Sequence, residues 1–150
     1  MKMLQVGEKA PNFEAIDQHE KPVKLADFAG KKLVVFFYPK ASTPGCTVEA
    51  CNLRDHYQTF LAQNYEVVGV SADSVKRQLN FANKHELPFS LLADEDKKVI
   101  EAFGVWGPKK FMGKEYDGIH RTTFVIDEKG IVSEVITKVK TKEHTAQILS

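Results

Sequence analysis

The chain has 150 residues, of which 43% are hydrophobic and 27% charged, close to the average of soluble domains. This length and composition exclude a disordered, collagenous or coiled-coil chain and predict one domain over residues 1–150. Twenty-one Lys and Arg against 20 Asp and Glu leave a net charge of +1, so no global field draws the protein to nucleic acid or an anionic membrane. The two cysteines, Cys46 and Cys51, are too few for a disulfide scaffold.

The apolar runs of the sequence bear on where the protein acts. Residues 1–9 contain no apolar run of signal-peptide length. The longest apolar run, Leu33–Tyr38, is about a third of the roughly 18 residues that a membrane span needs. We therefore expect a soluble, cytoplasmic protein with no membrane contact. Thiols in that compartment normally stay reduced, and a disulfide there is more often catalytic than structural.

The first half of the chain predicts a hairpin followed by a βαβ unit. Phe13–Asp17 and Val23–Leu25 flank a polar turn, as the strands of a short hairpin do. Lys32–Tyr38 is a short, continuous, β-rich apolar run before a proline, which favours a strand buried on both faces. Glu66–Ser71 predicts a second such strand, and Pro44 to about Gln63 a helix between the two. The crossover implies that these strands are parallel.

The second half predicts further alternation of helices and strands. In chain order we expect a helix over Asp73–His85 that is capped by Asp73 or Ser74, a short strand over Phe89–Leu92 and a short helix over Lys97–Phe103. An antiparallel hairpin of Arg121–Asp127 with Ile131–Thr137 should follow, and Thr141 should cap a closing helix that runs through Leu149. This pattern is typical of an α/β domain with a mixed central β-sheet.

Gly104–Gly118 is the least regular segment. It contains four glycines, Trp106 and the lysines Lys109, Lys110 and Lys114. A long loop in a small domain is often functional. The simpler interpretation is a solvated loop whose lysines face water, and we expect that arrangement.

Cys46 stands where a buried strand passes into a helix. Thr43 suits the N-cap of that helix, and Pro44 suits its first position because the missing N–H would be unsatisfied there. Cys46 then lies in the first turn, where free N–H groups and the helix dipole stabilise a thiolate. The thiolate is the nucleophilic form of cysteine. The alternative is a small buried hydrophobic residue, as most intracellular free cysteines are.

Helix geometry constrains Cys51. The predicted core face carries Cys46 together with Ala50, Leu53, Tyr57, Phe60 and Leu61. Cys51 points away from it, and in an intact helix its Cα would lie about 8.6 Å from that of Cys46. A disulfide needs roughly 4.4–6.8 Å between Cα atoms. The two thiols therefore cannot bond while the helix is whole, which favours a switchable bond over a static one.

A metal site is the rival interpretation of the two cysteines. His56 would be its third ligand, but no paired CxxC and no second histidine at zinc spacing accompany it in the sequence. We therefore expect neither a metal nor another cofactor.

The residues around Cys46 match a known family. Pro39-x-x-x-Thr43-x-x-Cys46 resembles the active-site signature of the peroxiredoxins. The wider run YPKASTPGCTVEACNLRD resembles the bacterioferritin comigratory protein group, also called PrxQ, as do Gly7–Phe13 and His120–Asp127. Ala41 and Ser42 replace the Asp-Asn or similar pair that is often found there. The resemblance covers nearly the whole chain and implies a thioredoxin-like fold.

The resemblance also implies roles for five residues. Cys46 would be the peroxidatic cysteine, which attacks the peroxide. Thr43 would hydrogen-bond the peroxide, Pro39 would shield the thiolate from water, and Arg121 would lie against the sulfur. Donors aimed at the charge that develops on the leaving oxygen are the usual source of acceleration. Glu49 is a supporting candidate that would orient Arg121 or the start of the helix, although an acid near a helix N-terminus is also favourable by itself.

Cys51 takes its role from the same resemblance. After attack, Cys46 would become a sulfenic acid, which condenses with a thiol. Cys51 would be the resolving cysteine in the same chain, so the helix must unfold locally to form the Cys46–Cys51 disulfide. Thioredoxin or a similar dithiol would then reduce that bond. The implied function is an antioxidant peroxidase for hydrogen peroxide and organic hydroperoxides, acting as a monomer.

Two other functions use the same residues. A general disulfide oxidoreductase on a thioredoxin-like fold would be expected to carry CxxC, which this sequence lacks. A redox-sensing or chaperone-like binding protein could use the same thiol switch. That protein would consume peroxide slowly and bind a partner only when oxidised.

Overall fold

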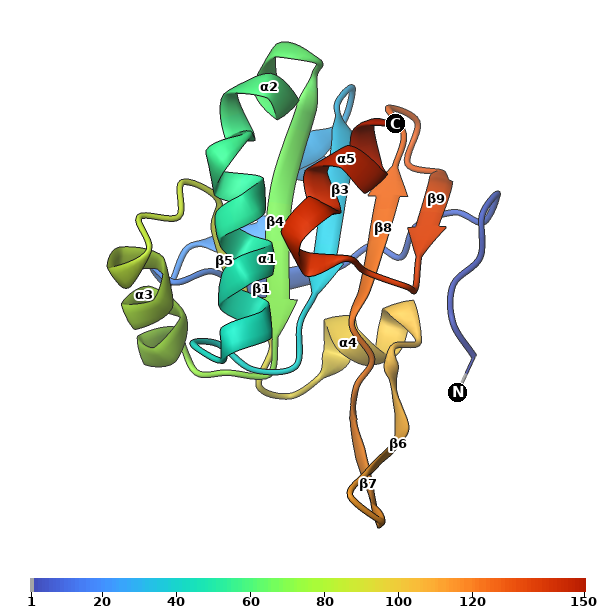
Figure 1. The fold of residues 1–150 in the computed structure, drawn as a ribbon. Coiled ribbons are helices and arrows are strands. Elements are labelled where there is room, and N and C mark those ends of the chain that lie inside the picture. The colour runs from blue at the N-terminus through green and yellow to red at the C-terminus, as the bar shows by residue number, and fades with distance from the viewer. Residues whose placement is uncertain (1) are drawn as a thin grey trace.

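A five-stranded mixed sheet forms the centre of the computed structural model, which describes residues 2–150 (Figure 1). The strand order is β5-β4-β3-β8-β9. Strands β3, β4 and β5 are parallel, whereas β8 is antiparallel to β3 and β9 to β8. The strands are β3 (Lys32–Phe37), β4 (Tyr65–Ser71), β5 (Ser90–Ala93), β8 (Thr122–Ile126) and β9 (Val132–Ile136). The predicted parallel βαβ unit and mixed sheet are confirmed.

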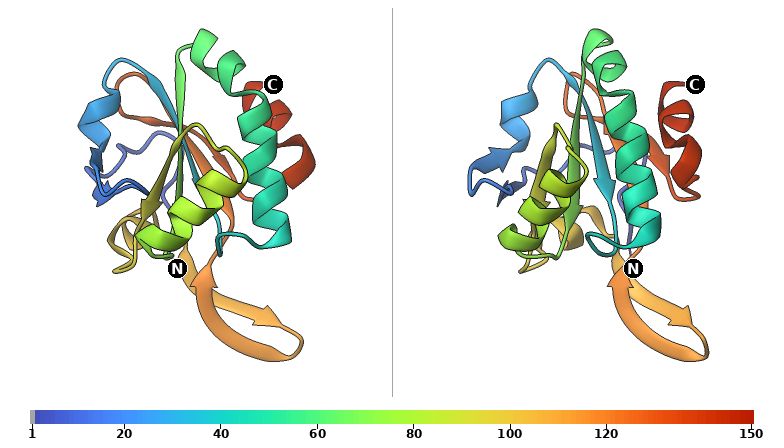
Figure 2. Two further views of the ribbon diagram at one scale, coloured as in Figure 1. Left: turned by 90° about the vertical axis from the view of Figure 1, so that its left-hand side faces the viewer. Right: turned by 60° about the vertical axis from the view of Figure 1, so that its left-hand side comes forward.

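Helices and the N-terminal segment cover opposite faces of this sheet (Figure 2). One face packs against α1 (Pro44–Asp55), α2 (Tyr57–Ala62), α3 (Val75–Lys84) and α5 (His144–Leu149). The other face packs against the N-terminal hairpin β1 (Glu14–Ile16) and β2 (Pro22–Lys24), the 3-10 turn η1 (Leu25–Phe28), and α4 (Lys98–Phe103). A sheet covered on both faces explains why its central strands are continuous apolar runs.

Strand β3 supplies both hydrophobic clusters of the fold. Val34 and Phe36 belong to the cluster under α1 and α3, whereas Leu33, Val35 and Phe37 belong to the cluster under α4. All five side chains are buried, because successive residues of a strand point to opposite faces. The run that ends in Pro39 is thus a two-sided core strand, and it fixes where the following loop leaves the sheet.

The predicted long helix is interrupted at His56. The ring Nδ1 of His56 lies 2.9 Å from the carbonyl oxygen of Asn52, which also accepts a hydrogen bond from the hydroxyl of Thr145. The backbone N–H of His56 donates instead to Leu53, three residues back. The chain therefore turns between α1 and α2, and Leu61, predicted to be buried, is 38% exposed.

Residues 104–118, predicted to be an irregular loop, form a projecting hairpin. Strands β6 (Trp106–Phe111) and β7 (Lys114–Ile119) pair along six positions and extend away from the sheet (Figure 1). Met112 and Gly113 both have positive φ, as a two-residue hairpin turn requires. Trp106 lies at the base of the hairpin, with the ammonium of Lys97 4.7 Å from its ring centre. Most of this hairpin is exposed. Its sequence therefore lacks the alternation of polar and apolar residues by which a half-buried strand is predicted.

Two helix starts test the predicted caps. The hydroxyl of Ser74 accepts a hydrogen bond from the N–H of Arg77, so Ser74, one of the two predicted caps, is the cap of α3. The closing segment begins with a 3-10 turn, η2 (Thr141–Glu143), and α5 follows from His144. Thr141 therefore does not cap the last helix, and this prediction was wrong. Within residues 2–150, no helix has the length and apolar character needed to cross a bilayer.

Phe124 joins the sheet to α4, and its removal should destabilise the fold. Its ring centre lies 5.7 Å from that of Phe37 and 5.1 Å from that of Phe103. We expect Phe124→Ala to lower the free energy of unfolding by about 3–5 kcal/mol, because truncation leaves a cavity. Phe111→Ala, at a hairpin side chain that is 65% exposed, should change it by less than about 0.5 kcal/mol. Denaturant titration of both variants measures the difference.

Candidate active site

The loop between β3 and α1 is held in place before the helix begins. The backbone N–H of Ala41 donates to Oδ2 of Asp73 at 2.7 Å, and the hydroxyl of Ser71 donates to the same oxygen at 2.6 Å. Asp73, the other predicted cap of α3, is buried and serves this loop instead. The contact ties the chain before Cys46 to the end of β4.

Thr43 precedes the first turn of α1, as predicted, but its hydroxyl does not cap the helix. Its backbone carbonyl accepts the N–H of Thr47 at 2.9 Å, and Pro44 follows at the first helical position. The hydroxyl donates instead to the carbonyl of Lys40 at 2.7 Å. Thr43 and Pro39 are both partly buried on this loop.

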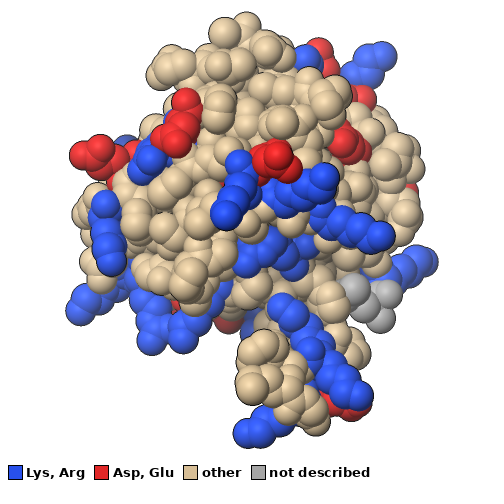
Figure 3. Space-filling view, viewed as in Figure 1, with Lys and Arg blue, Asp and Glu red and all other residues tan. Residues whose placement is uncertain are grey.

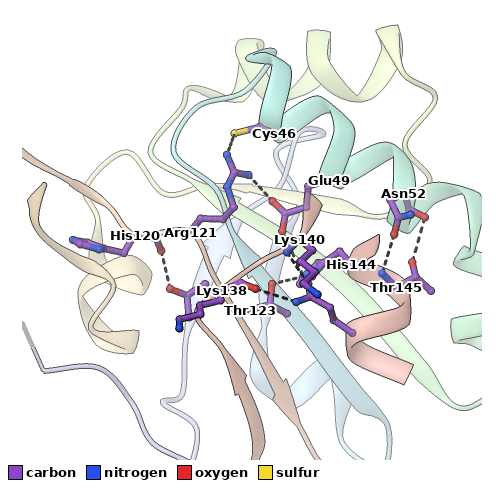
Figure 4. Close-up of polar contacts among 12 residues, drawn as sticks. Cys46, Glu49, Asn52, His120, Arg121, Thr123, Lys138, Lys140, His144 and Thr145 are labelled. Atoms are coloured by element: carbon purple, nitrogen blue, oxygen red, sulfur yellow. Dashed lines mark hydrogen bonds and ion pairs between the residues drawn. The ribbon is translucent and has the colours of Figure 1, made fainter. Parts of the chain in front are cut away.

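Arg121 brings β8 into contact with the start of α1 (Figure 4). Its Nη2 lies 3.4 Å from Sγ of Cys46, and its Nη1 donates to Oε1 of Glu49 at 2.7 Å. Arg121 immediately precedes β8, whose first residue pairs with the last residue of β3. Arg121 therefore lies at the end of the sheet where β3 finishes and the loop to Cys46 begins.

Gly45 leaves the space that the guanidinium occupies. A Cβ at Gly45 would lie 3.2 Å from Nη2 of Arg121, which is closer than an ordinary van der Waals contact. A side chain at position 45 would therefore press on the arginine. Glycine is favoured at position 45 because of Arg121, which is 76 residues later in the chain, so the local sequence gives no sign of this requirement.

Glu49 is a buried carboxyl group under the guanidinium. Burial raises its pKa to about 7, although Arg121 lowers it through its charge and hydrogen bond. Burial lowers the pKa of Arg121, but the charges of Cys46 and Glu49 and its hydrogen bonds to them more than offset this, so the pKa lies above its usual value. Arg121 is therefore a permanent cation between the two groups.

The surroundings of Cys46 are locally positive although the chain is almost neutral. Lys109 of β6 donates to the carbonyl of Ile119 at 2.9 Å, and its pKa is lowered by burial and by the nearby charge of Arg121. Figure 3 shows Lys and Arg side chains gathered across the middle of one face and along the hairpin. Lys109, predicted to face water in a loop, thus belongs to the electrostatic environment of the thiol. Nearby cations favour a thiolate.

Cys46 and Cys51 are both free thiols within one continuous helix. Cys46 is 1% exposed and Cys51 is partly buried. The next residue, Asn52, joins α1 to the end of the chain, because its Oδ1 accepts the N–H of Thr145 at 2.8 Å and its Nδ2 donates to the carbonyl of Lys142 at 2.9 Å. The helix that carries both thiols is therefore anchored just beyond the second one.

His56, the third ligand in the metal interpretation, has a backbone partner instead. His56 turns its ring to the carbonyl of Asn52. Over the part of the chain that the structure describes, no three His, Cys, Asp or Glu side chains are grouped to hold a metal ion.

Comparison with protein families and known sequences places the chain among its relatives. The model of the AhpC/TSA family matches residues 6–135. A protein named putative peroxiredoxin bcp, from Haemophilus influenzae, is 50% identical over 149 residues, which cover 99% of this chain and 96% of that protein. The chain belongs to the peroxiredoxin family.

Two solved structures show which branch of the peroxiredoxins this is. A Xylella fastidiosa PrxQ mutant has a TM-score of 0.93 at 29% identity and covers 99% of this chain and 95% of its own. A Xanthomonas campestris bacterioferritin comigratory protein, studied for alkyl peroxide reduction, has a TM-score of 0.86 at 35% identity, with coverages of 91% and 87%. These likenesses confirm the thioredoxin-like fold and the predicted Bcp/PrxQ resemblance of this peroxiredoxin.

The predicted site residues of this peroxiredoxin fall into three places. Arg121 contacts both Cys46 and Glu49. Pro39 and Thr43 lie on the loop before α1, and Cys51 lies on the next turns of the helix. Sequence reasoning missed the layer behind Glu49, which is formed by Thr123 of β8 with His144 and Gln147 of α5. A lone histidine in a short terminal helix carries no local signal of such a role.

Proposed function

We propose that this peroxiredoxin reduces hydrogen peroxide and organic hydroperoxides by attack of the Cys46 thiolate on the O–O bond. The observation that supports this most directly is the 3.4 Å contact between Sγ of Cys46 and Nη2 of Arg121. The sulfur bonds to one peroxide oxygen, and the O–O bond breaks. The other oxygen leaves as hydroxide or alkoxide and takes up a proton. Cys46 is then a sulfenic acid.

Each neighbour of Cys46 has a proposed part in this step. Arg121 stabilises the thiolate and donates to the oxygens on which charge develops. The Thr43 hydroxyl, which donates to the carbonyl of Lys40, keeps its lone pairs free to accept a hydrogen bond from the peroxide. Pro39 shields the sulfur from water. Glu49 holds Arg121 through the 2.7 Å bond to Nη1.

Cys51 completes the cycle in this proposal. The two thiols lie on one intact helix, so the first turns of α1 must unwind before Cys51 attacks the sulfenic acid. That attack forms the disulfide and releases water. An external dithiol, with thioredoxin as the best candidate, then reduces the disulfide. Since both thiols are in one chain, the cycle needs no second subunit, and we propose a cytoplasmic monomer.

Weakening the Asn52 anchor should speed disulfide formation. Asn52→Ala removes the bonds to Thr145 and Lys142, which together contribute about 1 kcal/mol at this partly exposed position. Because these bonds exist only while α1 is folded against the C-terminal segment, opening becomes roughly fivefold more frequent. Rapid quenching after peroxide addition, followed by mass analysis, measures the rate. Asn80→Ala, at an exposed residue of α3, is the control, and equal rates in the two variants would contradict the role of the anchor.

Intact mass after one equivalent of peroxide tests the proposed function as a whole. The unaltered protein should lose two hydrogens as the Cys46–Cys51 disulfide forms. Cys51→Ser should instead gain one oxygen as the sulfenic acid persists, and adding thioredoxin with its reductase should restore only the disulfide form. Cross-linked dimers would reject resolution within one chain. Rapid disulfide exchange with a protein substrate in the absence of peroxide would favour the general oxidoreductase instead.

A further inference from the structure

A buried Glu–His pair lies behind Arg121. One oxygen of Glu49, Oε1, accepts the hydrogen bond from Arg121. The other oxygen, Oε2, lies 3.4 Å from Nε2 of His144, and both side chains are fully buried (Figure 4). Within residues 2–150, Glu49 Oε2 is the one buried side-chain polar atom without a hydrogen-bond partner. An unpaired buried carboxylate oxygen is costly, so its environment calls for an explanation.

Gln147 fixes the proton on the far side of the imidazole ring. Its Oε1 accepts the backbone N–H of Lys140, and its Nε2 donates to the carbonyl of Lys138, each at 2.9 Å. These two backbone partners determine which amide atom is the oxygen. The same Oε1 lies 2.9 Å from Nδ1 of His144. Because a carbonyl oxygen only accepts, Nδ1 of His144 must carry a proton.

This tautomer leaves Nε2 of His144 without a proton when the ring is neutral. Nε2 then accepts a hydrogen bond from the Thr123 hydroxyl, which lies 2.7 Å away. Its lone pair would also face Oε2 of an ionised Glu49, so that two acceptors meet in a buried site. One additional proton removes the conflict. On Oε2 it is donated to the single lone pair of Nε2, which the Thr123 hydroxyl then shares or gives up; on Nε2 it is donated to Oε2 or to the Thr123 oxygen.

We propose that Glu49 and His144 share one proton, and that His144 is thereby a positioning residue that keeps Arg121 available to Cys46. The first part concerns the folded, reduced protein alone. The second part rests on the proposed peroxidase function. His144 touches neither the peroxide nor the reacting sulfur in this scheme and acts through Glu49.

The charges around the pair explain why its proton matters. The charged group that faces the pair is Arg121, before β8. Arg121 in turn interacts with Cys46 of α1 and with Lys109 of β6, while Thr123 and Gln147 are uncharged. With its proton the pair is neutral overall, so the charge of Arg121 is left to the thiolate. Without it, the Glu49 carboxylate competes for Arg121 and repels the sulfur.

The directions of the two pKa shifts agree with a shared proton. Burial raises the pKa of Glu49 to about 7 and lowers the pKa of His144, with Gln147 opposing that change and Arg121 adding to it. The proton therefore resides mainly on Oε2, beside a neutral ring. As pH rises past neutrality the proton leaves, and the rate constant for reaction with peroxide should fall by roughly three- to tenfold.

Nuclear magnetic resonance tests the proton directly. The reduced protein, labelled with ¹⁵N in histidine and ¹³C in glutamate, is followed from about pH 5 to about pH 9, the range around the usual histidine pKa, and His144→Gln assigns the ring signals. We expect Nδ1 to stay protonated throughout, and Nε2 and the Glu49 carboxyl carbon to change at the same pH. A neutral ring protonated at Nε2, or separate titrations of the two groups, would overturn the shared proton.

Stopped-flow kinetics against pH test the effect on the reaction. In His144→Gln the amide N–H donates to Oε2 of Glu49, which stabilises the carboxylate and lowers its pKa. Glu49 is then ionised over the whole range, so the rate should be low at every pH and the alkaline decline should disappear. His19→Gln, at an exposed histidine, should keep the decline. A uniform loss of rate with an unchanged profile in His144→Gln, as a purely structural role would give, overturns the positioning role. If Cys46 proves dispensable for turnover, the proposed function fails, while the resonance experiment still decides the proton.

Discussion

Replacing Cys46 by serine should abolish peroxide turnover. Serine fills the same space in the first turn of α1, but its hydroxyl is not ionised near neutral pH and is a weak nucleophile. Its neighbour at 3.4 Å is the cation Arg121, which cannot act as a base for the hydroxyl. We expect a loss of more than about 10⁴-fold, as when other enzymes lose their nucleophile. Consumption of hydrogen peroxide with thioredoxin, its reductase and NADPH measures the turnover.

The matched control is the same substitution at the second thiol. Cys51→Ser should reduce one equivalent of peroxide at the normal rate and then stop, because recycling needs the disulfide. If Cys46→Ser still turned over, Cys46 would not be the attacking group. If Cys51→Ser recycled normally, Cys51 would not be the resolving thiol.

The second large effect is expected at Arg121. Arg121→Met keeps the length and apolar stem of the side chain but removes both donors, the one at Cys46 and the one at Glu49. Losing one preorganised donor to a developing oxyanion commonly costs about 10²–10³-fold in rate. We expect a loss of at least about 10²-fold in the second-order rate constant, because this arginine also stabilises the thiolate.

Two comparisons separate this effect from a general loss of structure. Arg77→Met, at a side chain that is 65% exposed on α3, should keep the rate within about twofold, since surface ion pairs contribute little. Thermal unfolding of both variants measures stability. A rate for Arg121→Met within tenfold of the original, in a folded protein, would exclude Arg121 as the main source of acceleration.

The sequence was most informative where one short segment determines the structure. The apolar run of β3, the Thr43–Pro44 helix start and the Ser74 cap are local signals, and the structure contains each element. The interruption at His56 was not predictable, because it depends on the contact of Asn52 with Thr145, 93 residues later. The β6–β7 hairpin was missed because solvent covers most of it, so no apolar pattern marks its strands.

The residues of the site also divide into those that a local pattern predicts and those that it does not. Cys46 could be identified as a reactive thiol from its helix position, whereas Arg121 came from the family resemblance, because nothing around it indicates where its side chain reaches. The burial of Glu49 and the His144 layer behind it arise only when α1, β8 and α5 pack together. Contacts of this kind join segments that no local pattern relates.

The position of Trp106 gives the protein an optical reporter of its own. It is the only tryptophan in the chain, and it pairs with Ile119, two residues before Arg121. Indole emission responds to local polarity and to nearby charge such as that of Lys97. Displacement of the segment between β7 and β8, which carries Arg121, should therefore change the fluorescence with no dye attached. Oxidation, opening and reduction can then be timed in one cuvette on the unlabelled protein.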